Sequence, residues 1–132
     1  VAGLNATLAG ALTTTQVGGL AATVIGALTT GAITALDETQ IATLNTTQIQ
    51  SLKTAQLNAI SATTFDGLTT TELDALTTTQ IAGLSTAQIG NLDTTDVANL
   101  ETTQPGALTA TQLGSFTTIQ LDALTSTQIP AL

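Results

Sequence analysis

A large apolar residue returns at every eighth position of this chain, without an insertion or deletion. Ile60 and Phe116 fill two of these positions, and leucine fills the others, at 4, 12, 20, 28, 36, 44, 52, 68, 76, 84, 92, 100, 108, 124 and 132. A strict short period indicates one small structural unit stacked many times. We therefore expect residues 1–132 to form one continuous array of about 16 octapeptide copies, and to be a fragment of a longer array.

The order of residues within each octad predicts how a helix begins there. With the leucine at position 0, position +1 is Ser, Thr, Asn or Asp in 13 of 16 copies, and position +4 is Gln or Glu in 11. These two positions form a capping box, in which each side chain bonds the other residue's backbone N–H. Position +5 is a large apolar residue in 14 copies, and it would pack on the leucine that precedes the cap. Each octad is thus predicted to be a helix of one to two turns, and the small residues at +6 and +7 are predicted to let the chain turn sharply.

Two other structures compete with this spiral of short helices. A single long helix fits poorly, because eight residues advance each leucine by about 80° past two full turns and leave no continuous apolar face. A Thr-rich β-solenoid is the stronger competitor, since Thr, Ile and Val favour strands. Strand alternation would place positions 0 and +5 on opposite faces, however, and it gives the Gln at +4 no role. We predict an all-α solenoid with one very short helix per octad, with the β-solenoid as the alternative.

The apolar residues at 0 and +5 form the predicted core, because a one-turn helix is unstable unless it packs on its neighbours. The clearest octads supply the core residues Leu36, Ile41, Leu44, Ile49, Leu52, Leu76, Ile81, Leu84, Ile89 and Leu92. The capping pairs predicted for the same part of the chain are Asn45 with Gln48, Thr77 with Gln80, and Ser85 with Gln88. Pro105 at +5 and Pro130 at +6 are predicted to distort their helices without ending the array.

Charge and composition argue against several classes of partner. The net charge is −8 and Lys53 is the only cation, whereas nucleic acids and anionic membrane surfaces attract basic proteins. The longest nearly apolar run, residues 17–28, is shorter than the roughly 20 residues that a membrane helix needs. We expect no nucleic acid partner and no membrane insertion.

No residue pattern predicts catalysis, a cofactor or a metal site. The chain has no His, Cys, Met, Trp or Tyr, so its hydroxyl groups have no imidazole base beside them and haem has no axial ligand. The carboxylates form no recurring calcium loop, and we interpret them as helix caps and solvated charges. We therefore expect a protein that is not an enzyme. Asn5 and Asn45 match the N-glycosylation acceptor pattern, and exposed Thr residues suit O-linked sugars.

The run LTTTQIAGLSTAQIGNL, residues 76–92, resembles the L-T-T-x-Q-I-x-x-L arrays of very large bacterial surface and secreted repeat proteins, which are often labelled adhesin-like. The resemblance covers residues 4–132 and is strongest over 36–132. It implies an extracellular or cell-surface structural role, in which the array forms a rod, a stalk or a filament that grows by self-association. The alternative function is a module that binds a repetitive ligand, such as polysaccharide or ice, through arrayed Thr hydroxyls.

Overall fold

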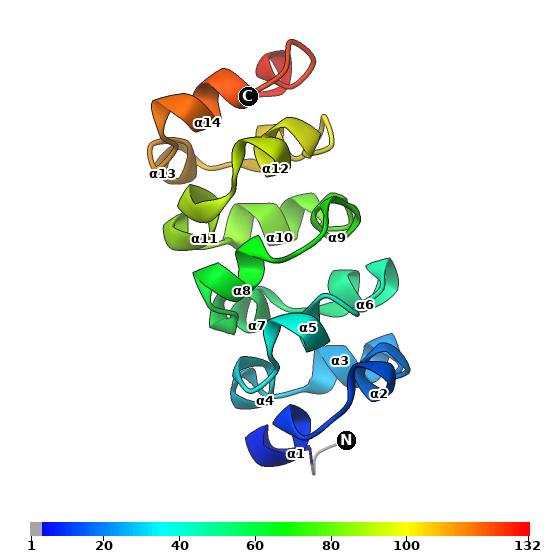
Figure 1. The fold of residues 1–132 in the computed structure, drawn as a ribbon. Coiled ribbons are helices and arrows are strands. Elements are labelled where there is room, and N and C mark those ends of the chain that lie inside the picture. The colour runs from blue at the N-terminus through cyan, green and yellow to red at the C-terminus, as the bar shows by residue number, and fades with distance from the viewer. Residues whose placement is uncertain (1–3) are drawn as a thin grey trace.

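The computed structural model describes residues 4–132, which form a stack of very short helices wound into a superhelix (Figure 1). Each octad contributes one helix, and the described residues contain no strand, so the predicted all-α solenoid is confirmed. The α-helices are α1 (Ala6–Gly10), α2 (Thr14–Gly18), α3 (Ala22–Ala27), α4 (Thr30–Thr34), α5 (Glu38–Ile41), α6 (Thr46–Ser51), α7 (Thr54–Ala59), α8 (Ala62–Asp66), α9 (Thr70–Asp74), α10 (Thr78–Gly83), α11 (Thr86–Asn91), α12 (Thr94–Asn99), α13 (Ala110–Leu113) and α14 (Thr118–Ala123). Two octads instead form the 3-10 helices η1 (Pro105–Ala107) and η2 (Ile129–Ala131).

The two proline-containing octads are those that form 3-10 helices. Pro105 and Pro130 each lie in the first turn of their helix, where a missing N–H costs least. The superhelix continues from η1 into α13 and α14 (Figure 1). Pro105 therefore shortens its helix locally without ending the array.

Each helix has its N-cap at position +1, except the two 3-10 helices, and its C-cap lies at the next position 0 or one to two residues before it. In α10, for example, the N-cap residue Thr77 has an extended backbone, and its hydroxyl accepts a hydrogen bond from the N–H of Gln80. At the other end, the N–H of Leu84 donates to the carbonyl of Ile81 at 3.2 Å, and the backbone of Leu84 is again extended. The residue at position 0 thus closes one helix and leads the chain into the next.

One turn of the superhelix takes between three and four octads. Helices three places apart in the chain pack on each other, as α1 does on α4, α3 on α6 and α8 on α11. Side chains at +4 donate hydrogen bonds to carbonyls that lie 28 to 31 residues earlier in the chain, slightly less than the 32 residues of four octads. Helix α1 lies at one end of the stack and α14 lies near the other (Figure 1).

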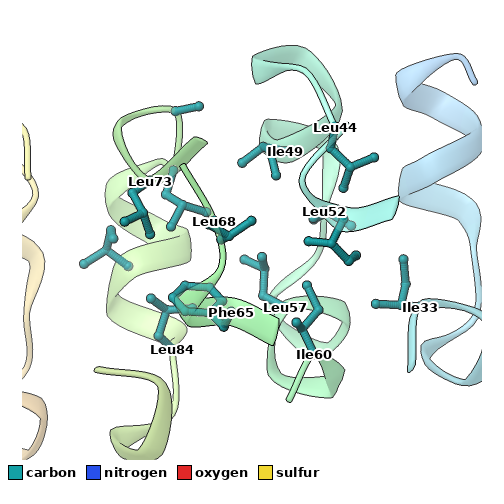
Figure 2. Packing of buried hydrophobic residues seen from close by; sticks show 14 of the residues in the cluster. Ile33, Leu44, Ile49, Leu52, Leu57, Ile60, Phe65, Leu68, Leu73 and Leu84 are labelled. Carbon is teal, nitrogen blue, oxygen red and sulfur yellow. The ribbon is translucent and has the colours of Figure 1, made fainter. Parts of the chain in front are cut away.

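The core runs along the inside of the superhelix. The side chains at 0 and +5 point inward from successive turns, as Leu52, Leu57, Phe65 and Leu68 do in Figure 2. All ten residues named above as core are buried, with at most 6% of their surface exposed. In the interior octads the apolar residues are thus buried by neighbouring octads and by the turns before and after.

The small residues at +6 and +7 have a second role besides the predicted one of letting the chain turn. No described residue has a positive φ, so no glycine there makes a left-handed turn. Several glycines also let two turns of the superhelix approach closely. A Cβ added at Gly26 would stand 2.6 Å from the carbonyl oxygen of Ser51, 25 residues later.

This close approach predicts opposite effects at two glycines that both occupy position +6. Gly26→Ala should lower the free energy of unfolding by about 1.5 kcal/mol, because the new methyl group meets backbone that cannot move freely. Gly90→Ala should raise it by about 0.5 kcal/mol, since its Cβ would lie 3.8 Å from Ser115 and alanine favours a helix. Urea denaturation of both variants checks this. An equal change in the free energy of unfolding for Gly26→Ala and Gly90→Ala would show that the spacing between turns does not require glycine at position 26.

Candidate functional site: a buried ladder of glutamines

The glutamine at +4 joins one turn of the superhelix to the turn before it. In α10, the Oε1 of Gln80 accepts a hydrogen bond from the N–H of Thr77 at 2.9 Å, which is its part in the capping box. Its Nε2 donates to the carbonyls of Ile49 and Leu52 at 2.9 and 2.7 Å. These carbonyls lie 31 and 28 residues earlier, at the junction of two octads of the preceding turn. One buried carboxamide therefore caps its own helix and links two turns.

The same link recurs at nine positions, and we call this set the glutamine ladder. In every case Nε2 donates to carbonyls 31 and 28 residues before it. All nine side chains are buried. The members are Gln40, Gln48, Gln56, Gln80, Gln88, Gln104, Gln112, Gln120 and Gln128.

Glutamine satisfies this position because it has both an acceptor and two donors on a side chain of the right length. Glutamate could complete the capping box, but as a carboxylate it has no proton to give to the preceding turn. Gln48, Gln80 and Gln88 were predicted only to cap their helices, and their second role was not predicted. A signal for it was present, since ten of the eleven Gln or Glu residues at +4 are Gln, although a cap accepts either.

Between Gln40 and Gln128, three octads have no glutamine at +4. Thr64 has no amide, and Glu72 and Asp96 have carboxylates. Both carboxylates complete the capping box expected of them, but both are buried, which was not expected. The Oε2 of Glu72 accepts from the N–H and the hydroxyl of Thr69, each at 2.7 Å, but its buried Oε1 has no hydrogen-bond partner. Glu72 thus completes its capping box and leaves the link to the preceding turn unmade.

Burial also changes the acidity of two aspartates. It is the main cause that raises the pKa of Asp96 above its ordinary value of 3.8, and the neighbouring charges of Asp93 and Asp66 raise it further. Burial likewise raises the pKa of Asp74, with an added contribution from Glu101. The pKa of Asp37 is instead lowered, chiefly by the hydrogen bond from the hydroxyl of Thr39 and also by one from the N–H of Gln40.

These shifts predict that the protein becomes more stable as the pH falls from 7 toward about 4. A carboxyl group whose folded-state pKa is raised contributes stability that is present at acid pH and lost as the pH rises through that pKa. The lowered pKa of Asp37 acts in the opposite sense, and its contribution is lost only below its ordinary value of 3.8. Urea midpoints measured from pH 7 to 4 should rise for the natural sequence and rise less for the double variant D74N/D96N. Parallel curves for the two proteins would contradict this assignment.

The structure places the other predicted site residues at helix starts. Asn45 and Ser85 are the N-caps of α6 and α11, and the side chain of each accepts from the N–H of the glutamine three residues later. Asn5 is the N-cap of α1 and accepts from the N–H of Leu8. Asn5 and Asn45 are exposed, and each uses its Oδ1 as the cap, so the Nδ2 that a glycan would modify is outside the capping bond.

Few other features of a ligand site are found. Residues 4–132 contain no pocket, and they contain no group of three acidic side chains placed to hold a metal ion. None of the helices described is long and apolar enough to cross a membrane. The exposed polar surface consists largely of Thr at +2 and +3, as at Thr46, Thr47, Thr78 and Thr79.

Comparison with known proteins identifies the repeat in the second half of the chain. Residues 68–102 and 97–132 match the ALTTAQ repeat family as two tandem copies. No curated protein and no solved structure is similar enough to the chain to match it. The family repeat thus spans several octads at once and supports a tandem array.

Proposed function

We propose, from the ALTTAQ match and the superhelix it belongs to, that this chain is a structural repeat module that forms a rod, stalk or self-assembling filament. The observation that carries this proposal is the constant spacing of the glutamine ladder. Because each turn offers the same carbonyls to the next, octads can be added without changing any contact. The number of octads then sets the length of the rod, and the ladder sets the spacing of its turns. A stalk requires such a defined length.

Self-association of residues 1–132 is proposed to occur by stacking of turns, in which a turn of a second copy takes the place that the next turn of the same array takes in the interior. Leu121 and Ile129 near one end are 42% and 55% exposed, and Leu8 near the other is 51% exposed. In interior octads the side chain at +5 is covered by the next turn. Carbonyls of the kind that accept from the ladder are also present near this end, at Leu121 and Leu124, and a turn from a second copy could bond them. Contacts between unlike ends repeat without closing and therefore produce filaments.

Concentration-dependent scattering and electron microscopy test this proposal. We expect fibres one superhelix wide whose mean length increases with protein concentration. Leu121→Lys should shorten them, because it places a charge on the proposed end contact, whereas Ile119→Lys should not. Ile119 is 67% exposed at position +3, which faces outward, and it serves as the matched control. Only short single particles at high concentration would exclude filament formation, and shortening by the Ile119 variant alone would indicate sideways association.

A location outside the bacterial cell is proposed from the sequence resemblance and from the Thr-rich, acidic and cysteine-free composition. Antibody labelling of intact bacterial cells tests it.

The exposed Thr pairs at +2 and +3 support a second candidate function, binding of a repetitive glycan or of ice. This candidate would need a flat face of ordered Thr such as a β-solenoid offers, whereas residues 4–132 form no strand and carry their Thr pairs on short helices. A glycan array and a thermal hysteresis measurement that both return nothing would remove it.

A further inference from the structure

Helix α8 has no ladder link to the turn on either side of it. Its +4 residue is Thr64, whose hydroxyl bonds the hydroxyl of Ser61 within the same octad. The two carbonyls that a glutamine there would reach, those of Ile33 and Leu36, accept no side-chain hydrogen bond among the described residues. On its other face, Asp96 takes the place of the glutamine that would donate to the carbonyls of Phe65 and Leu68.

Helices α6, α7, α10 and α11 are linked on both faces, whereas α5, α9 and α12 each have a link on one face. Helix α7 donates through Gln56 to Ile25 and Leu28, and its own octad accepts from Gln88. Helix α11 donates through Gln88 and accepts from Gln120. Helices α6 and α10 have the same two sets of links. Between α5 and α13, α8 is the one α-helix with neither.

Apolar contact is what holds α8 in place. Phe65 is fully buried and points into the cluster that includes Leu57 and Leu84 (Figure 2). Apolar burial is strong but non-directional, so it resists separation without fixing geometry as paired hydrogen bonds do. Repulsion between like charges also sets α8 apart from the linked helices, because the charge of Asp66 in α8 lies close enough to Asp96 to raise the pKa of Asp96. Lys53, the only cation of the chain, is exposed at the start of α7.

We infer that residues 61–68 form a joint in the superhelix, a segment that opens locally while the linked helices beside it stay folded. The low-stability units of a protein are those with few specific bonds to the rest of the structure. Opening of α8 would release two turns from each other on one side of the rod and let it bend there. This property concerns a single chain and does not depend on filament formation.

Amide hydrogen exchange followed residue by residue by NMR tests the joint. Amides of residues 61–68 should exchange about tenfold faster than those of α7 and α11, since each missing link removes two hydrogen bonds. The double variant T64Q/D96Q restores amide donors on both faces and should slow exchange in α8 by about tenfold while leaving α10 unchanged. Thr63→Gln is the matched control, because Thr63 is exposed at position +3 of the same octad and should leave exchange as it was.

Two results would overturn the inference. Exchange in α8 as slow as in α7 and α11 of the natural sequence would show that no joint exists, whatever the variants do. Fast exchange that T64Q/D96Q leaves unchanged would show that the missing links are not its cause. Circular dichroism shows whether the double variant is folded. If the double variant does not fold, the exchange rates of Thr64→Gln are compared with those of the natural sequence, which tests the link on one face of α8.

Discussion

Gln88→Glu should lower the free energy of unfolding by about 3 kcal/mol, although it replaces one NH2 group by one oxygen. The Nε2 of Gln88 donates to the carbonyls of Leu57 and Ile60 at 2.7 and 3.2 Å, and the side chain is 1% exposed. A carboxylate at this point loses both bonds and places a buried negative charge against two carbonyl oxygens. Urea denaturation with an unchanged slope would report the loss as a change in stability.

Gln16→Glu is the control for this substitution. Gln16 lies in α2, is exposed, and makes the capping bond to Thr13 without a described partner for its Nε2. The same chemical change there should alter the unfolding free energy by less than about 0.5 kcal/mol. Equal effects at the two positions would show that the ladder bonds contribute nothing beyond capping.

Glu72→Gln should have the opposite effect and raise the free energy of unfolding by about 2 kcal/mol. The buried Oε1 of Glu72 has no partner, and the carbonyls of Ile41 and Leu44 lie 31 and 28 residues before it, at the spacing that the ladder uses. Glutamine would keep the bond to the N–H of Thr69 and add the missing donors. The urea midpoint should therefore move upward.

The control removes the same charge at an exposed position. Glu38 lies in the first turn of α5 and is exposed, so Glu38→Gln reports the effect of lowering the net negative charge alone. We expect little change, since surface charges contribute weakly. If Glu72→Gln is no more stabilising than Glu38→Gln, the unpartnered oxygen is not a source of instability.

The two substitutions test a single rule from both directions. At a buried position where two carbonyl oxygens converge, a donor stabilises and an added acceptor destabilises. A capping box alone does not distinguish the two side chains, because Gln and Glu both accept from the N-cap N–H. The difference between Gln88→Glu and Gln16→Glu therefore measures the inter-turn link separately from the cap.

Much of the local structure could be predicted from the sequence. The pattern Thr77–x–x–Gln80 with Ile81 after it predicts where α10 begins and which side chains it buries, because all these interactions join residues within four positions. The prediction for the small residues at +6 and +7 was incomplete, since the chain turns there without a left-handed residue and the contact with the next turn was not foreseen. Gly26 is required by Ser51 of the following turn, which no local pattern indicates.

The sequence by itself determined the octad as the unit, the helix start at its second residue and the inward direction of its two apolar side chains. Only the tertiary structure decided how many octads complete a turn, which glycines touch the next turn, and that the carboxamide of Gln80 bonds Leu52 as well as Thr77. The physical reason is the range of the interactions. Capping and helix periodicity act over a few residues, whereas the stacking of turns joins residues 25 to 31 positions apart, and that separation depends on the summed rotation of several helices.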